Sequence, residues 1–144
     1  MNNENYNLFV YGSLRSGFHH PVYQYLSKYF YLIGDATVKS KLYDMGEYPV
    51  AIPTTEEKFV TGELYAANSA AEFDYAIVQL DDYEGLNVEA GETPLYKRAT
   101  TTVNCNGQEH TAWIYWFNGT IDGLPEIASG DILQYMQQKN KPQA

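Results

Sequence analysis

Cysteine and positive charge are scarce in this sequence. Its 144 residues include one cysteine, Cys105, so no disulfide can form within the chain, and the lone thiol favours a reducing, cytoplasmic location. The 9 lysine and arginine residues are outnumbered by 18 acidic residues, which gives a net charge of −9. A chain this acidic repels phosphate backbones, so we expect no nucleic-acid partner.

Long apolar segments are also missing. No stretch approaches the length of a membrane span, and no basic amphipathic segment suits a lipid surface, so we expect no membrane partner. Residues 1–5 lack the basic and apolar regions of a signal peptide. The length predicts one domain over residues 1–144, with residues 1–6 and 139–144 expected to fray.

Tyrosine, in contrast, is abundant, with 14 copies in the chain. This number indicates half-buried strands and an aromatic-lined surface or cleft. The three histidines have no spacing typical of a metal site, and no phosphate loop or dinucleotide fingerprint occurs, so we expect neither a metal nor another cofactor. Ser13 and Cys105 lack the surroundings of a nucleophile.

The periodicity predicts five or six strands and three helices in an α+β domain whose mixed sheet curls into a partly closed barrel. Gly62 is a candidate bulge, and Asn106-Gly107 predicts a hairpin turn with Cys105 inside it. The expected strands are 8–11, 31–43, 59–66, 96–103 and 111–117, and the expected helices begin at Pro21, Ser69 and Asp131.

The second helix ends in an unusual group of acids. It should begin at a capping box, bury Phe73, Ala76, Ile77 and Leu80, and stop at Gly85. Asp81, Asp82 and Glu84 then lie where the helix carries partial negative charge, which should raise their pKa values. They form either a solvated helix end or, for Glu84, an acid directed into a cleft.

The first strand leaves through the loop Tyr11-Gly12-Ser13-Leu14. A glycine at a strand end permits a positive φ or a close approach, and backbone N–H groups in such a turn can bind an anion or an oxyanion. The alternative is an ordinary strand-to-loop turn.

Five motifs in order resemble the gamma-glutamylcyclotransferase-like family, over residues 8–138. The residues that carry the resemblance are Tyr11-Gly12-Ser13-Leu14-Arg15, Leu42-Tyr43-Asp44-Met45-Gly46-Glu47-Tyr48-Pro49, Gly62-Glu63-Leu64-Tyr65, Leu80-Asp81-Asp82-Tyr83-Glu84-Gly85 and Tyr96-Lys97-Arg98. The resemblance implies a small mixed β-barrel flanked by helices. It also implies release of 5-oxoproline from a γ-glutamyl group, with Glu84 as the catalytic residue, Tyr11 to Leu14 as the anion loop, and no cofactor.

The remaining candidates are side chains that could contact a γ-glutamyl substrate. Tyr43, Tyr48, Tyr96 and Tyr115 are candidates to line the pocket. Each is equally explained as a strand tyrosine with its hydroxyl at the rim, and for Tyr115 we favour this second explanation. Arg98 could bind a substrate carboxylate or pair with a neighbouring acid. A binding module that uses the same cavity, and a hydrolase in which Glu84 activates water, are the alternatives. The sequence indicates no oligomeric state and no particular γ-glutamyl substrate.

Overall fold

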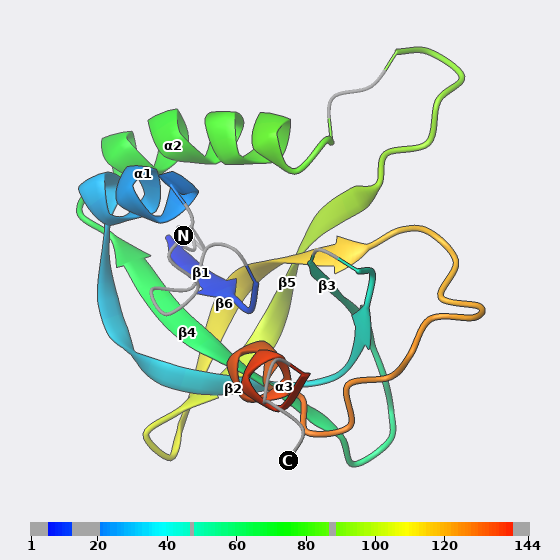
Figure 1. Cartoon of the computed structure of the whole chain (residues 1–144). Coiled ribbons are helices and arrows are strands. Elements are labelled where there is room, and N and C mark those ends of the chain that lie inside the picture. The colour runs from blue at the N-terminus through cyan, green and yellow to red at the C-terminus, as the bar shows by residue number, and fades with distance from the viewer. Residues whose placement is uncertain (1–5, 13–20, 47, 87–88, 140–144) are drawn as a thin grey trace.

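The computed structural model describes residues 6–12, 21–46, 48–86 and 89–139, which form six strands and three helices (Figure 1). The strands are β1 (Asn7–Val10), β2 (Phe30–Asp44), β3 (Pro49–Pro53), β4 (Phe59–Ala67), β5 (Tyr96–Cys105) and β6 (Gln108–Phe117). The helices are α1 (Pro21–Tyr29), α2 (Ala70–Tyr83) and α3 (Ile132–Lys139). No helix in these ranges is long and apolar enough to cross a membrane.

Five of the strands close into a barrel of mixed direction. β4 pairs antiparallel with β1 and β2, β1 lies parallel to β6, and β5 pairs antiparallel with β6 and β2. The order β2–β4–β1–β6–β5 therefore returns to β2, and β3 extends the sheet as the antiparallel neighbour of β2. The α+β fold with a small mixed barrel is confirmed, and the barrel is closed rather than partly closed.

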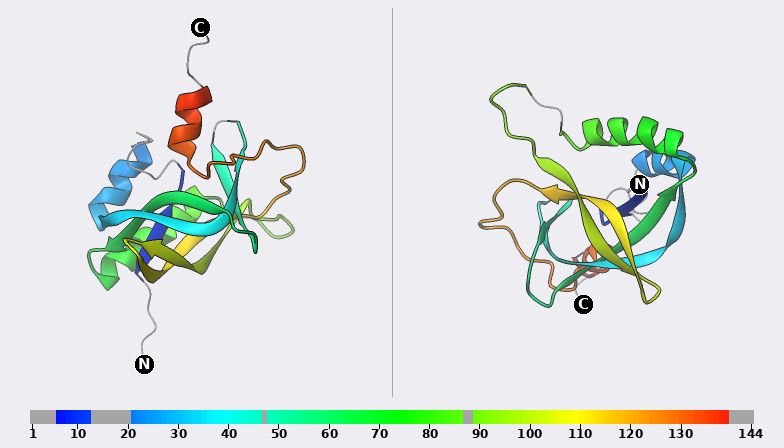
Figure 2. Two further views of the ribbon diagram at one scale, coloured as in Figure 1. Left: turned by 90° about the horizontal axis from the view of Figure 1, so that it is seen from below. Right: turned by 180° about the vertical axis from the view of Figure 1, so that it is seen from behind.

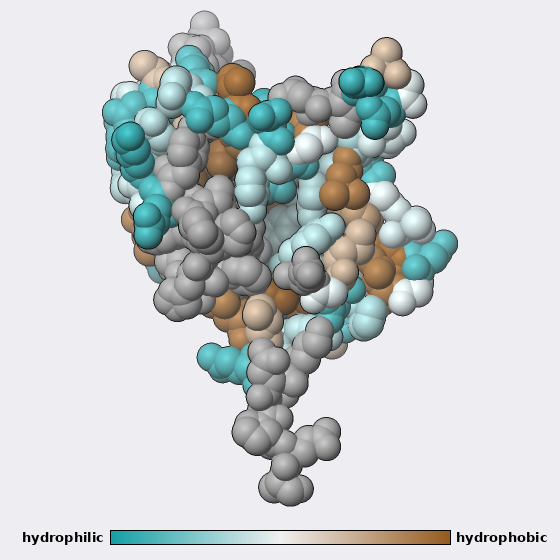
Figure 3. Space-filling model, turned by 45° about the horizontal axis from the view of Figure 1, so that its top comes forward, coloured by the Kyte–Doolittle hydropathy of each residue, from teal (hydrophilic) through white to brown (hydrophobic). Residues whose placement is uncertain are grey.

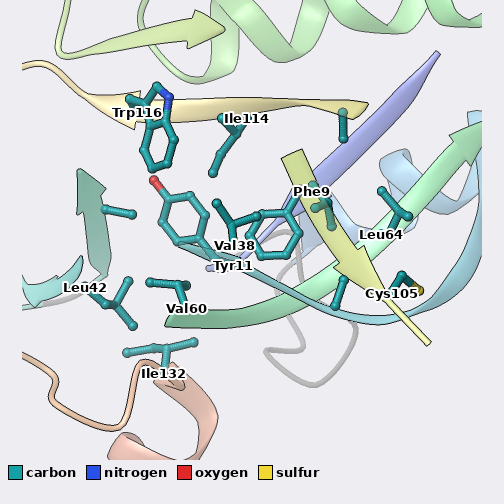
Figure 4. Close-up of a cluster of buried hydrophobic side chains, with 14 of the residues drawn as sticks. Phe9, Tyr11, Val38, Leu42, Val60, Leu64, Cys105, Ile114, Trp116 and Ile132 are labelled. Atoms are coloured by element: carbon teal, nitrogen blue, oxygen red, sulfur yellow. The ribbon is translucent and has the colours of Figure 1, made fainter. Parts of the chain in front are cut away.

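The barrel interior is an apolar cluster to which every strand contributes. Phe9, Val60, Leu64 and Ile114 are almost fully buried in it, and Ile132 at the start of α3 packs against the same cluster (Figure 4). Alternate strand residues point inward and outward, so the outward positions of the same strands are free to form a second cluster.

This second cluster lies between the barrel and two helices. α1 and α2 lie next to each other over one side of the barrel, away from α3 (Figures 1 and 2). Leu26 of α1 is buried there, and the buried residues of α2 are Phe73, Ala76, Ile77 and Leu80, as its periodicity predicted. At the start of α2 the Ser69 side chain accepts a hydrogen bond from the Glu72 N–H at 3.1 Å, which confirms the predicted N-cap.

The prediction of a bulge at Gly62 was wrong. The β2–β4 ladder passes through the pair Ala36↔Gly62 without a shift, and the irregularity lies between Leu32 and Gly34. Glycine is needed at position 62 because the end of β1 lies close beside it. An added Cβ would collide with the Val10 carbonyl oxygen.

The predicted hairpin turn is confirmed, but it is shorter than expected. Asn106 and Gly107 have φ values of 54° and 78°, as a two-residue turn of this type requires. Cys105 is therefore not a turn residue but the last residue of β5, paired with Gln108 and 2% exposed. Tyr6, expected to fray, is instead fixed: its carbonyl accepts a hydrogen bond from the Ala67 N–H at 2.9 Å.

Candidate active site at the end of α2

The C-terminus of α2 is fixed by backbone hydrogen bonds. The Leu86 N–H donates to the Asp81 carbonyl at 3.0 Å, the Gly85 N–H donates to the Asp82 carbonyl at 3.1 Å, and Gly85 has φ 77°. This is a Schellman ending, in which glycine takes the left-handed conformation that the turn demands. Glu84 is the C-cap residue, so its backbone position is set by the helix before it and the turn after it.

The Glu84 carboxyl group has a strongly shifted proton affinity. Burial, and secondarily the negative charge of Asp81, raises the pKa of Glu84 to about 7. Among the described residues, no hydrogen-bond donor is found for this carboxylate, so none of them offsets the cost of burying its ionised form. A side chain of this kind can take up and release protons near neutral pH.

Asp81 lies one turn earlier, and both of its carboxylate oxygens accept hydrogen bonds. Arg98 donates from Nε to Asp81 Oδ1 at 2.7 Å and from Nη2 to Oδ2 at 3.0 Å, and the Tyr115 hydroxyl donates to Oδ1 at 2.8 Å. Of the two alternatives weighed for Arg98, the structure shows the pairing with a neighbouring acid. Tyr115, assigned from the sequence as a strand tyrosine, is 4% exposed and belongs to this arrangement.

Three tyrosine hydroxyls lie within electrostatic reach of Glu84. Burial is the largest cause of raised pKa values at Tyr11, Tyr96 and Tyr115, and the charge of Glu84 contributes at each. These phenols therefore stay protonated at neutral pH and are available as hydrogen-bond donors. Tyr11 lies inside the barrel, where its hydroxyl donates to the Tyr115 carbonyl at 2.6 Å, and Figure 4 shows it directed towards Trp116.

The loop after β1 is described only at its start. Gly12 approaches β3 closely, since an added Cβ would lie 3.3 Å from the Pro49 side chain, and its φ is not among the positive values. Close approach, rather than a positive φ, is thus the reason for this glycine. Ser13 and Leu14 lie outside the described residues, so the anion-binding role of the loop stays a prediction.

The other predicted pocket tyrosines occupy two different environments. Tyr43 is 7% exposed and packs in the same cluster as Tyr96 and Tyr115, whereas Tyr48 is 37% exposed and its charge contributes to the raised pKa of Tyr96. The space-filling view shows a hollow near the centre of one face, with side chains of intermediate hydropathy around it (Figure 3). Substrate contacts by these tyrosines are still predictions.

Two features of the site were missed from the sequence. Tyr115 was not linked to Asp81, and the Arg98 guanidinium lies over the Trp113 ring at 4.5 Å, a contact that was not expected. A usable signal was present, because positions 113 and 115 share one face of β6. Within the described ranges, no group of three or more His, Cys, Asp or Glu residues could hold a metal ion.

Comparisons with known proteins cover nearly the whole chain. A family model described as gamma-glutamyl cyclotransferase, AIG2-like, matches residues 8–134. The gamma-glutamylcyclotransferase family protein YtfP of Escherichia coli is 32% identical over 127 residues, which are 88% of this chain and 95% of YtfP. The gamma-L-glutamyl-butirosin B gamma-glutamyl cyclotransferase of Niallia circulans is 33% identical over 134 residues, 92% of this chain and 78% of that protein. The structure of YkqA from Bacillus subtilis is similar with a TM-score of 0.68 and 27% identity, over 96% of this chain and 44% of YkqA.

Proposed function

The chain belongs to the AIG2-like gamma-glutamyl cyclotransferase family and is a gamma-glutamylcyclotransferase-like enzyme, and from this premise we propose that it releases 5-oxoproline from a γ-glutamyl compound with Glu84 as general acid and base. The observation that carries the proposal is the Glu84 carboxyl group, fixed at the end of α2 with a pKa raised to about 7. An ordinary glutamate would be too weak a base for this task.

The proposed reaction begins with a proton transfer. The α-amine of a γ-glutamyl group has a pKa near 8, so it is largely protonated at neutral pH and cannot attack. Glu84, with a pKa close to that of the amine, takes the proton at little cost in free energy. The freed amine then attacks the side-chain carbonyl carbon of the same molecule, which closes a five-membered ring. Because attack is intramolecular, holding the substrate folded supplies much of the acceleration.

The second half of the reaction returns the proton. The tetrahedral intermediate carries an oxyanion, for which we assign the backbone N–H groups of Gly12, Ser13 and Leu14 as donors. The bond to the leaving amine breaks as protonated Glu84 gives its proton to that amine. The ring nitrogen then loses its second proton, which the released amine takes up, and 5-oxoproline remains. Tyr43, Tyr48 and Tyr96 are the proposed lining of the substrate pocket. For Arg98, the contacts favour pairing with Asp81 over binding of a substrate carboxylate.

The test is 5-oxoproline release from a panel of γ-glutamyl amino acids, γ-glutamyl amines and glutathione. We expect Glu84→Gln to lower kcat/KM by about 10²- to 10⁴-fold, because the variant cannot exchange the proton. The matched control is Asp82→Asn, which changes an exposed acid two residues earlier and should retain activity. In the wild type, kcat/KM should rise with pH through about 7, since only the ionised form of Glu84 is a base.

Three outcomes would contradict the proposal. Undiminished release by Glu84→Gln would separate the activity from this mechanism. Release of free glutamate in place of 5-oxoproline would favour the hydrolase. Saturable binding of a γ-glutamyl compound with no product from any substrate would favour a binding module.

A further inference from the structure

The two acids at the end of α2 have opposite surroundings. Asp81 and Glu84 are three residues apart, so their side chains lie on the same face of the helix, one turn apart. The Asp81 carboxylate accepts three side-chain hydrogen bonds, two from Arg98 and one from Tyr115. Among the described residues, side chains therefore hold the Asp81 carboxylate, and none of them donates a hydrogen bond to the Glu84 carboxylate.

The groups that hold Asp81 form one outward face of the β5–β6 hairpin. Arg98 and Tyr115 lie directly opposite each other across the ladder, which brings their side chains next to each other on the same side of the sheet. The Arg98 guanidinium also stacks over Trp113, two residues from Tyr115, so it has a restrained orientation. Its planar fork then meets the Asp81 carboxylate with both bonds at once.

Tyr115 extends this arrangement into the barrel. Its hydroxyl donates to Asp81, while its backbone carbonyl accepts the hydroxyl of Tyr11 at 2.6 Å from the interior. A continuous set of hydrogen bonds thus runs from the barrel interior through β6 to the last turn of α2.

We propose that Asp81, clamped by Arg98 and Tyr115, is a positioning residue for the reaction: it holds the last turn of α2 on the β5–β6 hairpin and keeps a fixed negative charge beside Glu84. This inference rests on the proposed function of Glu84 and assigns the Arg98 cation to Asp81. The ion pair is only about one fifth exposed, with side-chain exposures of 22% for Arg98 and 17% for Asp81, so water screens it less than a surface pair.

The effect on Glu84 follows from the charges that face it. Asp81 lies on its own helix, Arg98 with Tyr96 and Tyr115 on the hairpin, and Tyr11 after β1. The tyrosines are neutral at neutral pH, so among the described residues Asp81 is the charge that acts on Glu84. Removing the charge of Asp81 removes a repulsion, which lowers the pKa of Glu84.

The experiment is the pH dependence of kcat/KM for 5-oxoproline release by Asp81→Asn, which keeps the shape of the side chain without its charge. We expect the acid limb to move down by about one pH unit and kcat to fall about tenfold, with a smaller change in KM. Asp82→Asn, the control, should keep the wild-type profile. A wild-type profile for Asp81→Asn would overturn the inference, even if Glu84→Gln is inactive.

A second variant and a second readout guard against misfolding and against failure of the proposed function. Tyr115→Phe removes one hydrogen bond from Asp81 and leaves the ion pair, so it should produce a smaller loss of kcat in the same direction. The Glu84 titration can be followed by carboxyl NMR without any substrate. A lower Glu84 pKa in folded Asp81→Asn supports the inference whether or not 5-oxoproline is released, and an unchanged pKa refutes it.

Discussion

The barrel carries two apolar clusters, one on each side of its wall, and they differ in chemistry. The buried side chains of the inner cluster are aliphatic and aromatic, apart from the Cys105 thiol, and among the described residues their one hydroxyl is that of Tyr11, which is hydrogen-bonded to the backbone. The outer cluster, against α1 and α2, contains the buried tyrosines Tyr43, Tyr65, Tyr96 and Tyr115, and the acidic end of α2 borders it. The same strands build both clusters, since alternate residues face opposite sides.

This difference explains where a titratable group can function. An acid inside the closed barrel would have no route for its proton, and its ionised form would be costly to bury. At the edge of the outer layer, Glu84 is buried enough to have a raised pKa and still partly exposed. In the proposed mechanism, the inner cluster provides stability alone, whereas the outer cluster also borders the residue assigned to the chemistry. Each prediction below tests one side of this division.

The largest expected effect is on the inner side, at Gly62. A methyl group there would collide with the Val10 carbonyl of β1 at 2.2 Å, so we expect Gly62→Ala to cost about 4 kcal/mol or more of unfolding free energy, measured by urea denaturation. Thr100→Ala, at an exposed position on β5, is the control and should cost about 1 kcal/mol or less. A similarly small loss of unfolding free energy for Gly62→Ala would mean that the end of β1 does not lie so close to Gly62.

The second prediction concerns the outer cluster, where we expect a substitution to raise the free energy of unfolding. The raised pKa of Glu84 means that the folded chain retains this proton at pH values where the unfolded chain has lost it, so ionising Glu84 opposes folding above about pH 4.5 and fully above about pH 7. Glu84→Gln should therefore stabilise the fold by about 2 kcal/mol at pH 8, after allowance for partial exposure.

The same variant should give almost no stabilisation at pH 4, where Glu84 is protonated in both states. Urea midpoints at the two pH values, with Asp82→Asn measured in parallel, provide the check. A stabilisation of equal size at both pH values would trace the gain to packing and would remove the contrast between the two clusters. The predicted result is a trade-off, in which the inactive variant is the more stable one.

The smallest effect is expected at Tyr11, which joins the two sides. Tyr11→Phe keeps the buried ring but leaves the Tyr115 carbonyl without its hydroxyl partner. We expect a loss of about 1.5 kcal/mol in unfolding free energy. Tyr31→Phe, at a side chain 55% exposed, should change stability very little. Equal effects of the two variants would show that the hydrogen bond from the Tyr11 hydroxyl to the Tyr115 carbonyl contributes nothing to stability.

Local features of the fold were predictable from the sequence, and long-range ones were not. The buried face of α2, its Ser69 cap and its stop at Gly85 depend on residues within one or two turns, so periodicity and capping rules were sufficient. β3 is absent from the strands predicted from the sequence: it is short and bounded by Pro49 and Pro53, and its position is set by pairing with β2.

The candidate site likewise has a local feature that the sequence predicted and long-range contacts that it did not. The unusual acids at the end of α2 were visible as a local conflict with the helix dipole, and this conflict singled out Glu84. The bidentate pairing of Asp81 with Arg98 joins residues 17 positions apart, and the Tyr115 contact joins residues 34 positions apart. No local rule gives such pairs, because they depend on how the hairpin meets the helix in three dimensions.

The position of β1 has a consequence for the order in which the chain is assembled. β1 is made first, yet its partners are far along the chain: Leu8 lies opposite Tyr65 in β4 and opposite Trp113 in β6. During synthesis this apolar strand emerges before either neighbour exists. β4 (Phe59–Ala67) can pair with one of its edges first, and β6 (Gln108–Phe117) reaches the other edge only when most of the domain has left the ribosome. One edge of β1 thus stays open through most of synthesis, although both of its edges are paired in the finished barrel wall.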